Sequence, residues 1–294
     1  MFLQIISTYY SGYNFYLKNS EFFTNLYCET ALLNFLVMFF AILRAIALVM
    51  IYFILTTLIS FFLPNETNHF GYACLHIIGE VSFLFAFNSL IIRELDVGVL
   101  KVKKGTNYVF IVLLAFLIAG VNFLLIALFS TLKFQPTRFV FSHFIESVII
   151  LFLASLAEEY FFRRILMENV RKFTGVFASM VISSILFSMA HFFNTDYTLI
   201  AYVNLFLGGM LLSLIYTKYH VLGSVLFHFS WNISQTFLGS RVSGNTFYHF
   251  LDIRYEFNTF TGNNFGFESS LANSLVLLGA ISYLLKYHLN TKNE

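Results

Sequence analysis

Two adjacent glutamates, Glu158 and Glu159, interrupt the apolar stretch IILFLASLAEEYFFRRIL. On a helix, Glu159 and Arg163 stand four residues apart on one face, and we expect them to pair. Glu158 is rotated by about 100° from Glu159 and has no such local cation. Such a spacing would hold one carboxylate structurally and leave the other available for chemistry. A charged helix end at a membrane surface would give the same pattern.

Two further polar pairs interrupt the apolar segments that follow. Phe187 and His191 share a helix face in VISSILFSMAHFF, so the phenyl ring is expected to pack beside the imidazole. His228 and Asn232 are likewise one turn apart in VLGSVLFHFSWNIS. Hydrogen bonds to neighbouring helices would account for either pair without any chemistry. Ionisable groups inside apolar spans nevertheless raise the free energy of insertion into a membrane. Each histidine is therefore also a candidate functional residue.

Helix geometry connects the first two clusters. If the segments that carry them form an antiparallel hairpin at Thr174 and Gly175, Glu158 lies 16 residues before the turn and His191 lies 16 residues after it. Both side chains are then roughly 24 Å from the turn and level with one another. A carboxylate and an imidazole at one level suit a general-base pair around a water molecule. Both are also zinc ligands, so a metal site stays open as an interpretation.

The composition places these residues in a membrane protein. Of 294 residues, 59% are hydrophobic and 11% are charged, whereas soluble domains carry about 25% charged residues. The formal net charge of +2 gives no excess of basic residues that would indicate nucleic-acid binding. Cys28 and Cys74 have no metal or redox spacing. We interpret them as thiols in apolar surroundings, with a disulfide as the alternative. The sequence therefore predicts a lipid bilayer as the environment and no nucleic-acid partner.

Helical spans explain the apolar runs, because about 20 apolar residues cross a bilayer as a helix. Eight stretches meet or approach that length: 33–63, 70–92, 108–132, 144–167, 176–193, 199–216, 222–237 and 270–287. We expect an all-α, polytopic membrane protein with about eight transmembrane helices. Its expected parts are an N-terminal interfacial segment (1–30), N-terminal transmembrane helices (31–140) and a helical core that carries the polar clusters (141–290).

The distribution of lysine and arginine predicts an orientation, because cytoplasmic loops are enriched in both. With eight spans, the side that holds both termini carries twelve of these residues: Lys18, Arg93, Lys101, Lys103, Lys104, Arg163, Arg164, Arg171, Lys172, Lys218, Lys286 and Lys292. The other side carries four: Lys133, Arg138, Arg241 and Arg254. This favours a multi-pass protein of the cell membrane with both termini in the cytoplasm. With the hairpin geometry, this orientation would place Glu158 and His191 toward the opposite leaflet. An inverted orientation, or a glutamate-bearing helix that begins deeper in the membrane, would place them differently.

Together the motifs EExxxR, FxxxH and HxxxN, in this order, resemble the CPBP family of intramembrane glutamic endopeptidases, which includes type II CAAX prenyl proteases and Abi-like, bacteriocin-processing proteins. The stretch NLFLGGMLLSLIYTKYHVLGSVLFHFSWN is similar to the family's signature. FGFESS, at residues 265–270, resembles a G-x-E-G-S element that precedes the last helix in many bacterial members. The resemblance covers roughly residues 144–287.

The resemblance implies an endopeptidase that hydrolyses a peptide bond in a membrane-associated or lipidated substrate through glutamate-activated water. It implies Glu158 as general base, His191 as the residue that orients the water, and His228 and Asn232 as oxyanion donors. Glu159, Arg163 and Phe187 would support this site. No cofactor is implied, although a zinc-dependent version of the same protease stays open.

Other classes of function remain as alternatives. A non-catalytic bacteriocin-immunity or scaffold protein would keep the fold and bind membrane partners, but it would gain nothing from four buried polar groups. A small transporter could use Glu158 and Glu159 as a proton relay, but the sequence shows no internal repeat. The oligomeric state and the identity of the substrate, including whether it is prenylated, are not indicated by the sequence.

Overall fold

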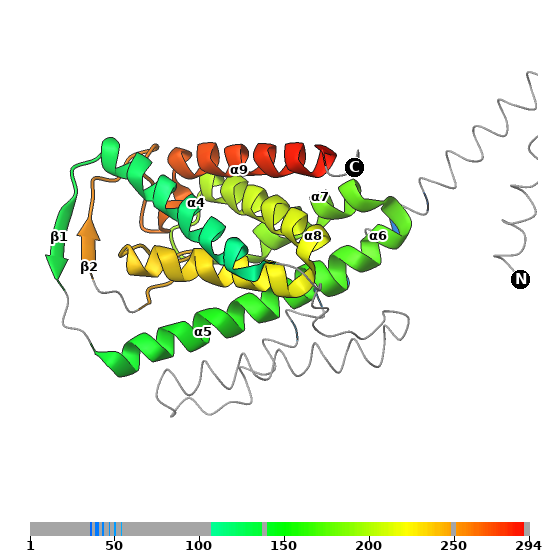
Figure 1. Cartoon of the computed structure of the whole chain (residues 1–294), viewed down its shortest axis with the longest axis horizontal. Helices are drawn as coiled ribbons and strands as arrows, with labels where there is room; N and C mark the ends of the chain where they lie inside the picture. The colour runs from blue at the N-terminus through cyan, green and yellow to red at the C-terminus, as the bar shows by residue number, and fades with distance from the viewer. Residues whose placement is uncertain are drawn as a thin grey trace, which may run out of the picture.

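The computed structural model of the chain describes residues 107–136, 140–247 and 251–290, together with seven separate helical positions between 36 and 54 (Figure 1). The predicted interfacial segment 1–30 and the predicted span 70–92 lie outside these residues, as does most of the span 33–63. The described part is mainly helical, which confirms the helical fold class there.

Helix α4 (Tyr108–Leu128) is apolar along its whole length. It begins after Asn107, whose side-chain oxygen accepts the backbone N–H of Phe110 at 3.1 Å, an ordinary helix cap. One face is buried against α8 and α9. The other face exposes large apolar side chains such as Val109, Leu117 and Leu124. An exposed apolar face of this length is what a lipid-facing helix needs.

A long helix carries the two adjacent glutamates. It comprises α5 (Phe141–Glu159), a π-helical segment η1 (Tyr160–Met167) and α6 (Glu168–Thr174). The predicted span 144–167 lies within it. Gly175 ends the helix at a φ of 83°, in the left-handed region that glycine adopts without a steric penalty. Helix α7 (Val176–Ala190) then returns along it, so the predicted hairpin is present.

Helix α8 (Leu199–Phe237) bends back on itself at His220, where φ is 59° and ψ is −170°. Asn204 and Trp231 lie in its two halves, and both donate hydrogen bonds to Glu268. On a straight helix they would be about 40 Å apart. The two halves therefore run side by side (Figure 1), and they correspond to the predicted spans 199–216 and 222–237.

A short antiparallel strand pair departs from the all-helical prediction. Strand β1 (Lys133–Pro136) follows α4 and pairs with β2 (Leu251–Arg254), with Lys133 opposite Arg254. A 3₁₀ turn, η2 (Phe267–Ser269), leads into α9 (Leu271–Asn290). Strands of four residues are too short for an alternating pattern to reveal them.

Within the described residues, three helices are long and apolar enough to cross a membrane: Tyr108–Leu128, Phe141–Thr174 and Leu199–Phe237. The last of these contains the bend at His220. Val176–Ala190 and Leu271–Lys286 are shorter apolar helices. The total of eight spans includes residues outside the description and stays a prediction.

Gly209 sets how closely the first half of α8 approaches α7. A Cβ atom at this position would lie 2.9 Å from the Cβ and 3.0 Å from the Cα of Ser184. We expect Gly209→Ala to lower the free energy of unfolding by about 1–3 kcal/mol through overpacking. Thermal denaturation in detergent measures the effect.

Gly208→Ala is the matched control, because a Cβ there meets nothing within 4 Å. Equal melting temperatures for the two variants would contradict the close approach of the two helices.

Candidate active site

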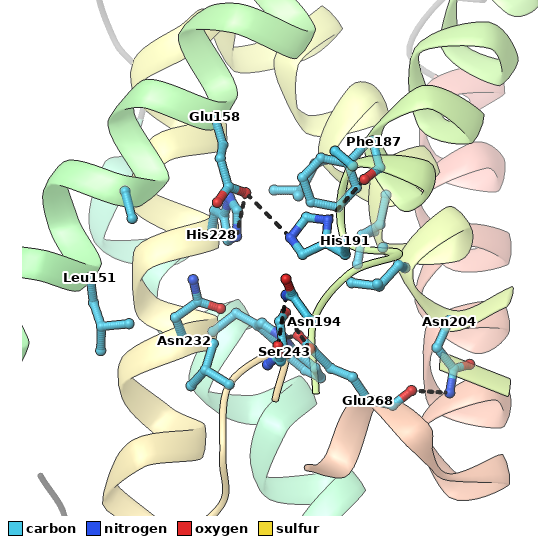
Figure 2. Close-up of a pocket in the computed structure, with 18 of the residues that line it drawn as sticks. Leu151, Glu158, Phe187, His191, Asn194, Asn204, His228, Asn232, Ser243 and Glu268 are labelled. Atoms are coloured by element: carbon cyan, nitrogen blue, oxygen red, sulfur yellow. Dashed lines mark hydrogen bonds and ion pairs between the residues drawn. The ribbon is translucent and has the colours of Figure 1, made fainter. Parts of the chain in front are cut away.

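A cavity of about 480 Å³ lies among α5, α7, both halves of α8 and the start of α9. All four residues predicted as catalytic line it: Glu158, His191, His228 and Asn232. Phe187, predicted to support the site, lines it too. Figure 2 shows these side chains converging from three helices. Glu159 and Arg163 are completely buried and do not line the cavity.

Glu158 stands between two imidazoles. Its Oε2 lies 4.0 Å from His191 Nε2 and 3.9 Å from His228 Nε2 (Figure 2). Both distances exceed those of a direct hydrogen bond. The side chain is 26% exposed, and Oε2 is buried without a hydrogen-bond partner among the described residues. The level of Glu158 and His191 predicted from the hairpin is therefore correct.

The other ring nitrogen of each histidine is already engaged. His191 Nδ1 lies 2.9 Å from the carbonyl oxygen of Phe187, and His228 Nδ1 lies 3.0 Å from Glu159 Oε1. A carbonyl or carboxylate oxygen only accepts, so each Nδ1 must carry the proton. In a neutral ring, Nε2 is then an acceptor, and in both residues it is turned toward Glu158.

This arrangement suits the binding of one water molecule. A water that donates about 2.8 Å hydrogen bonds to Glu158 Oε2 and to His191 Nε2 can bridge the gap between them. The angle between its two hydrogen bonds would be roughly 90°, close to the geometry of water. The carboxylate and an imidazole can thus orient the same water molecule.

Glu159 forms the ion pair predicted from its spacing with Arg163. The Nη1–Oε1 distance is 2.8 Å, and both side chains are fully buried. Arg163 Nη2 also donates to the carbonyl oxygen of Gly209, and its guanidinium lies 4.5 Å from the ring centre of Phe187. The same Phe187 ring lies 4.9 Å from that of His191, as expected. These contacts connect η1 with α7 and α8 behind the cavity.

Asn232 is one turn beyond His228 on the second half of α8, and both face the cavity. Its Nδ2 is 3.5 Å from Ser155 Oγ, a long hydrogen bond at most. The amide of Asn232 is therefore only weakly engaged by the protein. Such a group is available to a substrate oxygen in the cavity.

Residues 139–234 match the family model described as Rce1-like, type II CAAX prenyl endopeptidase. About a third of the chain is thus an Rce1-like segment. The match confirms the resemblance found in the sequence. No curated protein matches the chain. The Rce1-like segment contains all of the site residues predicted from the sequence: Glu158, Glu159, Arg163, Phe187, His191, His228 and Asn232.

Glu268 lies outside the Rce1-like segment and was not predicted as a site residue. It lines the cavity near the ends of the helices. Oε1 accepts from Trp231 Nε1 and Gln235 Nε2, both at 3.2 Å. Oε2 accepts from the backbone N–H and the hydroxyl of Ser243, at 3.0 and 2.7 Å. Its position in FGFESS was the available signal, but spacing alone did not reveal these partners.

The turn at Ser243 and Gly244 closes one wall of the cavity. Ser243 and Gly244 have φ values of 48° and 83°. Asn194 donates to the carbonyl of Ser243 at 2.8 Å, and Thr195 donates to that of Gly244 at 2.9 Å. Asn194 and Thr195 follow His191 closely in the chain, so this turn is fixed to the segment that carries the catalytic candidate.

Two tyrosines outside the spans are neutral near pH 7. Burial raises the pKa of Tyr197, which donates to the carbonyl of Ser188. Burial also raises the pKa of Tyr255. Since the ordinary pKa of tyrosine is about 10, neither side chain is charged at that pH. Among the described residues, no group of three His, Cys, Asp or Glu side chains that could hold a metal ion is found.

The buried ion pair gives a stability prediction for the Rce1-like segment. Glu159→Gln removes a fully buried negative charge and leaves Arg163 without its counter-ion. We expect the free energy of unfolding to fall by about 3 kcal/mol. The readout is thermal denaturation in detergent.

Asp196→Asn is the matched isosteric control. Asp196 pairs with Arg241 at 3.3 Å, but both side chains are about 40% exposed. Exposed pairs contribute about 0–1 kcal/mol, so this variant should melt near the wild type. If Glu159→Gln also melted unchanged, the pair would not have the structural role given to it.

Proposed function

We propose that the chain is an intramembrane endopeptidase that hydrolyses a peptide bond of a membrane-associated peptide or protein with water activated by Glu158. One observation carries this proposal: the carboxylate of Glu158 faces the Nε2 atoms of His191 and His228 on the wall of a cavity within apolar helices. The matched family, one of prenyl endopeptidases, supports hydrolase chemistry at the level of the family.

In the proposed reaction, Glu158 removes a proton from water while the oxygen attacks the carbonyl carbon of the scissile peptide bond. His191 orients the water from the other side. The tetrahedral intermediate carries a negative oxygen, and the protonated Glu158 returns the proton to the leaving amine as the C–N bond breaks. The net reaction adds one water molecule and forms a carboxylic acid and an amine.

His228 and Asn232 are the proposed donors to the oxyanion. With Nδ1–H donated to Glu159, a neutral His228 presents only a lone pair at Nε2. Its role as a donor therefore requires the imidazolium form, which has protons on both nitrogens. Glu159 on one side and Glu158 on the other are suitable counter-ions. The amide of Asn232 donates without any change of protonation.

A non-catalytic scaffold protein would not need these residues for chemistry. A non-catalytic protein has no use for a partly exposed carboxylate with an unpartnered oxygen at the centre of a cavity. Buried polar atoms without partners are rare in proteins and destabilise them. We therefore favour the catalytic interpretation, and the variants below distinguish the two.

Glu158→Gln tests the general base. The change keeps the shape of the side chain but removes proton acceptance, so hydrolysis should fall by about 10²–10⁴-fold. The assay uses purified protein in proteoliposomes with fluorescence-quenched peptides, each offered with and without a farnesyl group. Melting temperature is measured in parallel and is expected to stay near that of the wild type.

Glu146→Gln is the control, because Glu146 lies on the same helix but does not line the cavity. Wild-type turnover by Glu158→Gln would exclude Glu158 as the base. Loss of turnover in a chelator, together with one zinc per chain by elemental analysis, would instead favour the zinc-dependent version of this protease.

Asn232→Ala tests the oxyanion donor. Losing one such donor typically lowers kcat by about 10²–10³-fold. Since the oxyanion forms only after the ground state, KM should change much less than kcat. Steady-state kinetics on the same peptides provides both values. A raised KM with unchanged kcat would show that Asn232 binds substrate and does not stabilise the transition state.

A further inference from the structure

Glu268 is a nearly buried residue that lines the same cavity as Glu158 (Figure 2). Each of its carboxylate oxygens accepts two hydrogen bonds: Oε1 from Trp231 and Gln235, and Oε2 from the backbone and the hydroxyl of Ser243. Since each oxygen has two lone pairs, all four acceptor positions are occupied. Glu268 is therefore poorly suited to take a proton from water or to bind a substrate. Its contacts indicate that it holds other groups in place.

The backbone around Glu268 is itself held by hydrogen bonds. Asn204, on the first half of α8, donates to the carbonyl oxygen of Glu268 at 2.7 Å and to that of Ser270 at 2.8 Å. The preceding residue, Phe267, donates its backbone N–H to Ser240 Oγ at 3.0 Å. The carboxylate is thus attached to a well-anchored segment, and it can fix the side chains that donate to it.

Asn232, the proposed oxyanion donor, belongs to a helix that is attached at two places. His228, one turn earlier, is hydrogen-bonded to the buried ion pair. Trp231 and Gln235, which stand one turn apart, are hydrogen-bonded to Glu268. On a helix, Trp231 points about 60° to one side of His228 and Asn232 about 40° to the other. Two attachments that differ in direction and in height resist rotation of the helix, so together they set the direction of Asn232.

This direction matters because the side chain of Asn232 is only weakly engaged by the protein. Its Nδ2 is 3.5 Å from Ser155 Oγ. With its side chains a helix has a radius of about 5–6 Å, so a rotation of about 10° moves an atom at its surface by about 1 Å. A misplacement of about 1 Å can lower a reaction rate by about 10²-fold. We therefore expect turnover to depend on the attachment that Glu268 forms.

The second oxygen of Glu268 fixes a turn in the cavity wall. Ser243 has a φ of 48°, in the left-handed region that raises the free energy of residues other than glycine. The hydrogen bonds from its N–H and hydroxyl to Glu268 offset this strain. Its carbonyl accepts from Asn194, three residues after His191. One carboxylate thereby connects the helix that carries Asn232 with the segment that follows His191.

We propose that Glu268 is a positioning residue for the hydrolysis, an inference that rests on the proposed function. It touches neither the attacking water nor the substrate, and it acts through Trp231 and Gln235 on the direction of Asn232. Asn232 lies within the Rce1-like segment, whereas Glu268 lies beyond its end at residue 234. The loop and helix that follow this segment thus orient a donor that belongs to it.

A double-mutant cycle separates this role from a general contribution to folding. Glu268→Gln leaves one acceptor oxygen, whereas Trp231 Nε1 and Ser243 N donate to different oxygens of Glu268. We expect kcat on the quenched peptides to fall by about 10–10²-fold, with KM changed by less than about twofold. In the Asn232→Ala background the same change should lower kcat by less than about twofold, because its target is already absent.

Gln235→Met is a second variant, which leaves the contacts of Ser243 intact. It removes one attachment of α8 together with Gln235 Oε1, a buried atom without a hydrogen-bond partner among the described residues. Because such atoms destabilise proteins, the melting temperature should stay near that of the wild type or rise. We nevertheless expect kcat to fall by about tenfold, and only when Asn232 is present.

Glu256→Gln is the matched control, because Glu256 is exposed in the same connecting segment and does not line the cavity. It should keep the kcat of the wild type. Equal losses of kcat with and without Asn232 would overturn the proposal, since the effect of Glu268 would not then pass through that side chain. Wild-type kcat in Glu268→Gln would overturn it as well.

Trp231 allows a test that needs no substrate, because it is the only tryptophan in the chain. Its indole N–H donates to Glu268 Oε1. Glu268→Gln removes the adjacent charge and should shift the tryptophan emission maximum of the purified protein, whereas Glu256→Gln should not. An unchanged spectrum would overturn the proposal whether or not the chain hydrolyses peptides. A shifted spectrum without hydrolysis by the wild type would count against the protease, and with it against a catalytic use of Glu268, while the attachment of Trp231 would stand.

Discussion

The fully buried ion pair between Glu159 and Arg163 constrains the structure around it. Two charges inside an apolar bundle persist only where other groups compensate their lost hydration. Here Arg163 also reaches the carbonyl of Gly209, and Glu159 also accepts from His228. Gly209 must lack a side chain for this approach to Ser184. The pair thereby fixes both halves of α8 relative to η1. Glu159 Oε2 and Arg163 Nε have no hydrogen-bond partner among the described residues, so the burial of the two charges is not fully compensated. Positioning His228 therefore explains the presence of the ion pair better than a gain in stability does.

Local geometry made part of the site predictable. The Glu159–Arg163 pair and the contact of Phe187 with His191 follow from helical spacing, and the level of Glu158 and His191 follows from a hairpin with a short turn. The approach of His228 to Glu158 depends on how the second half of α8 packs on α5. That contact joins residues 70 positions apart, and no periodicity in the sequence encodes it. His228 was found through its spacing to Asn232 and through family resemblance.

Loop conformation and helix irregularity account for what the sequence did not reveal. The four donors to Glu268 come from the second half of α8 and from the turn at Ser243, which adopts a left-handed backbone conformation. The π-helical segment Tyr160–Met167 has the composition of an ordinary helix, so its wider winding is a result of tertiary packing. π-Helical turns occur frequently at functional sites, and this one begins directly after Glu159.

The two adjacent glutamates show how position alone divides their roles. Glu159 is completely buried and accepts from Arg163 and His228, so it cannot meet a substrate. Glu158, one residue earlier and rotated about 100° on the helix, is 26% exposed and faces both imidazoles across gaps of 3.9 and 4.0 Å. Through His228 the buried carboxylate also acts on the exposed one, because Glu159 holds Nδ1 and thereby turns Nε2 toward Glu158. A change at Glu159 would therefore disturb the surroundings of Glu158 without touching the cavity itself.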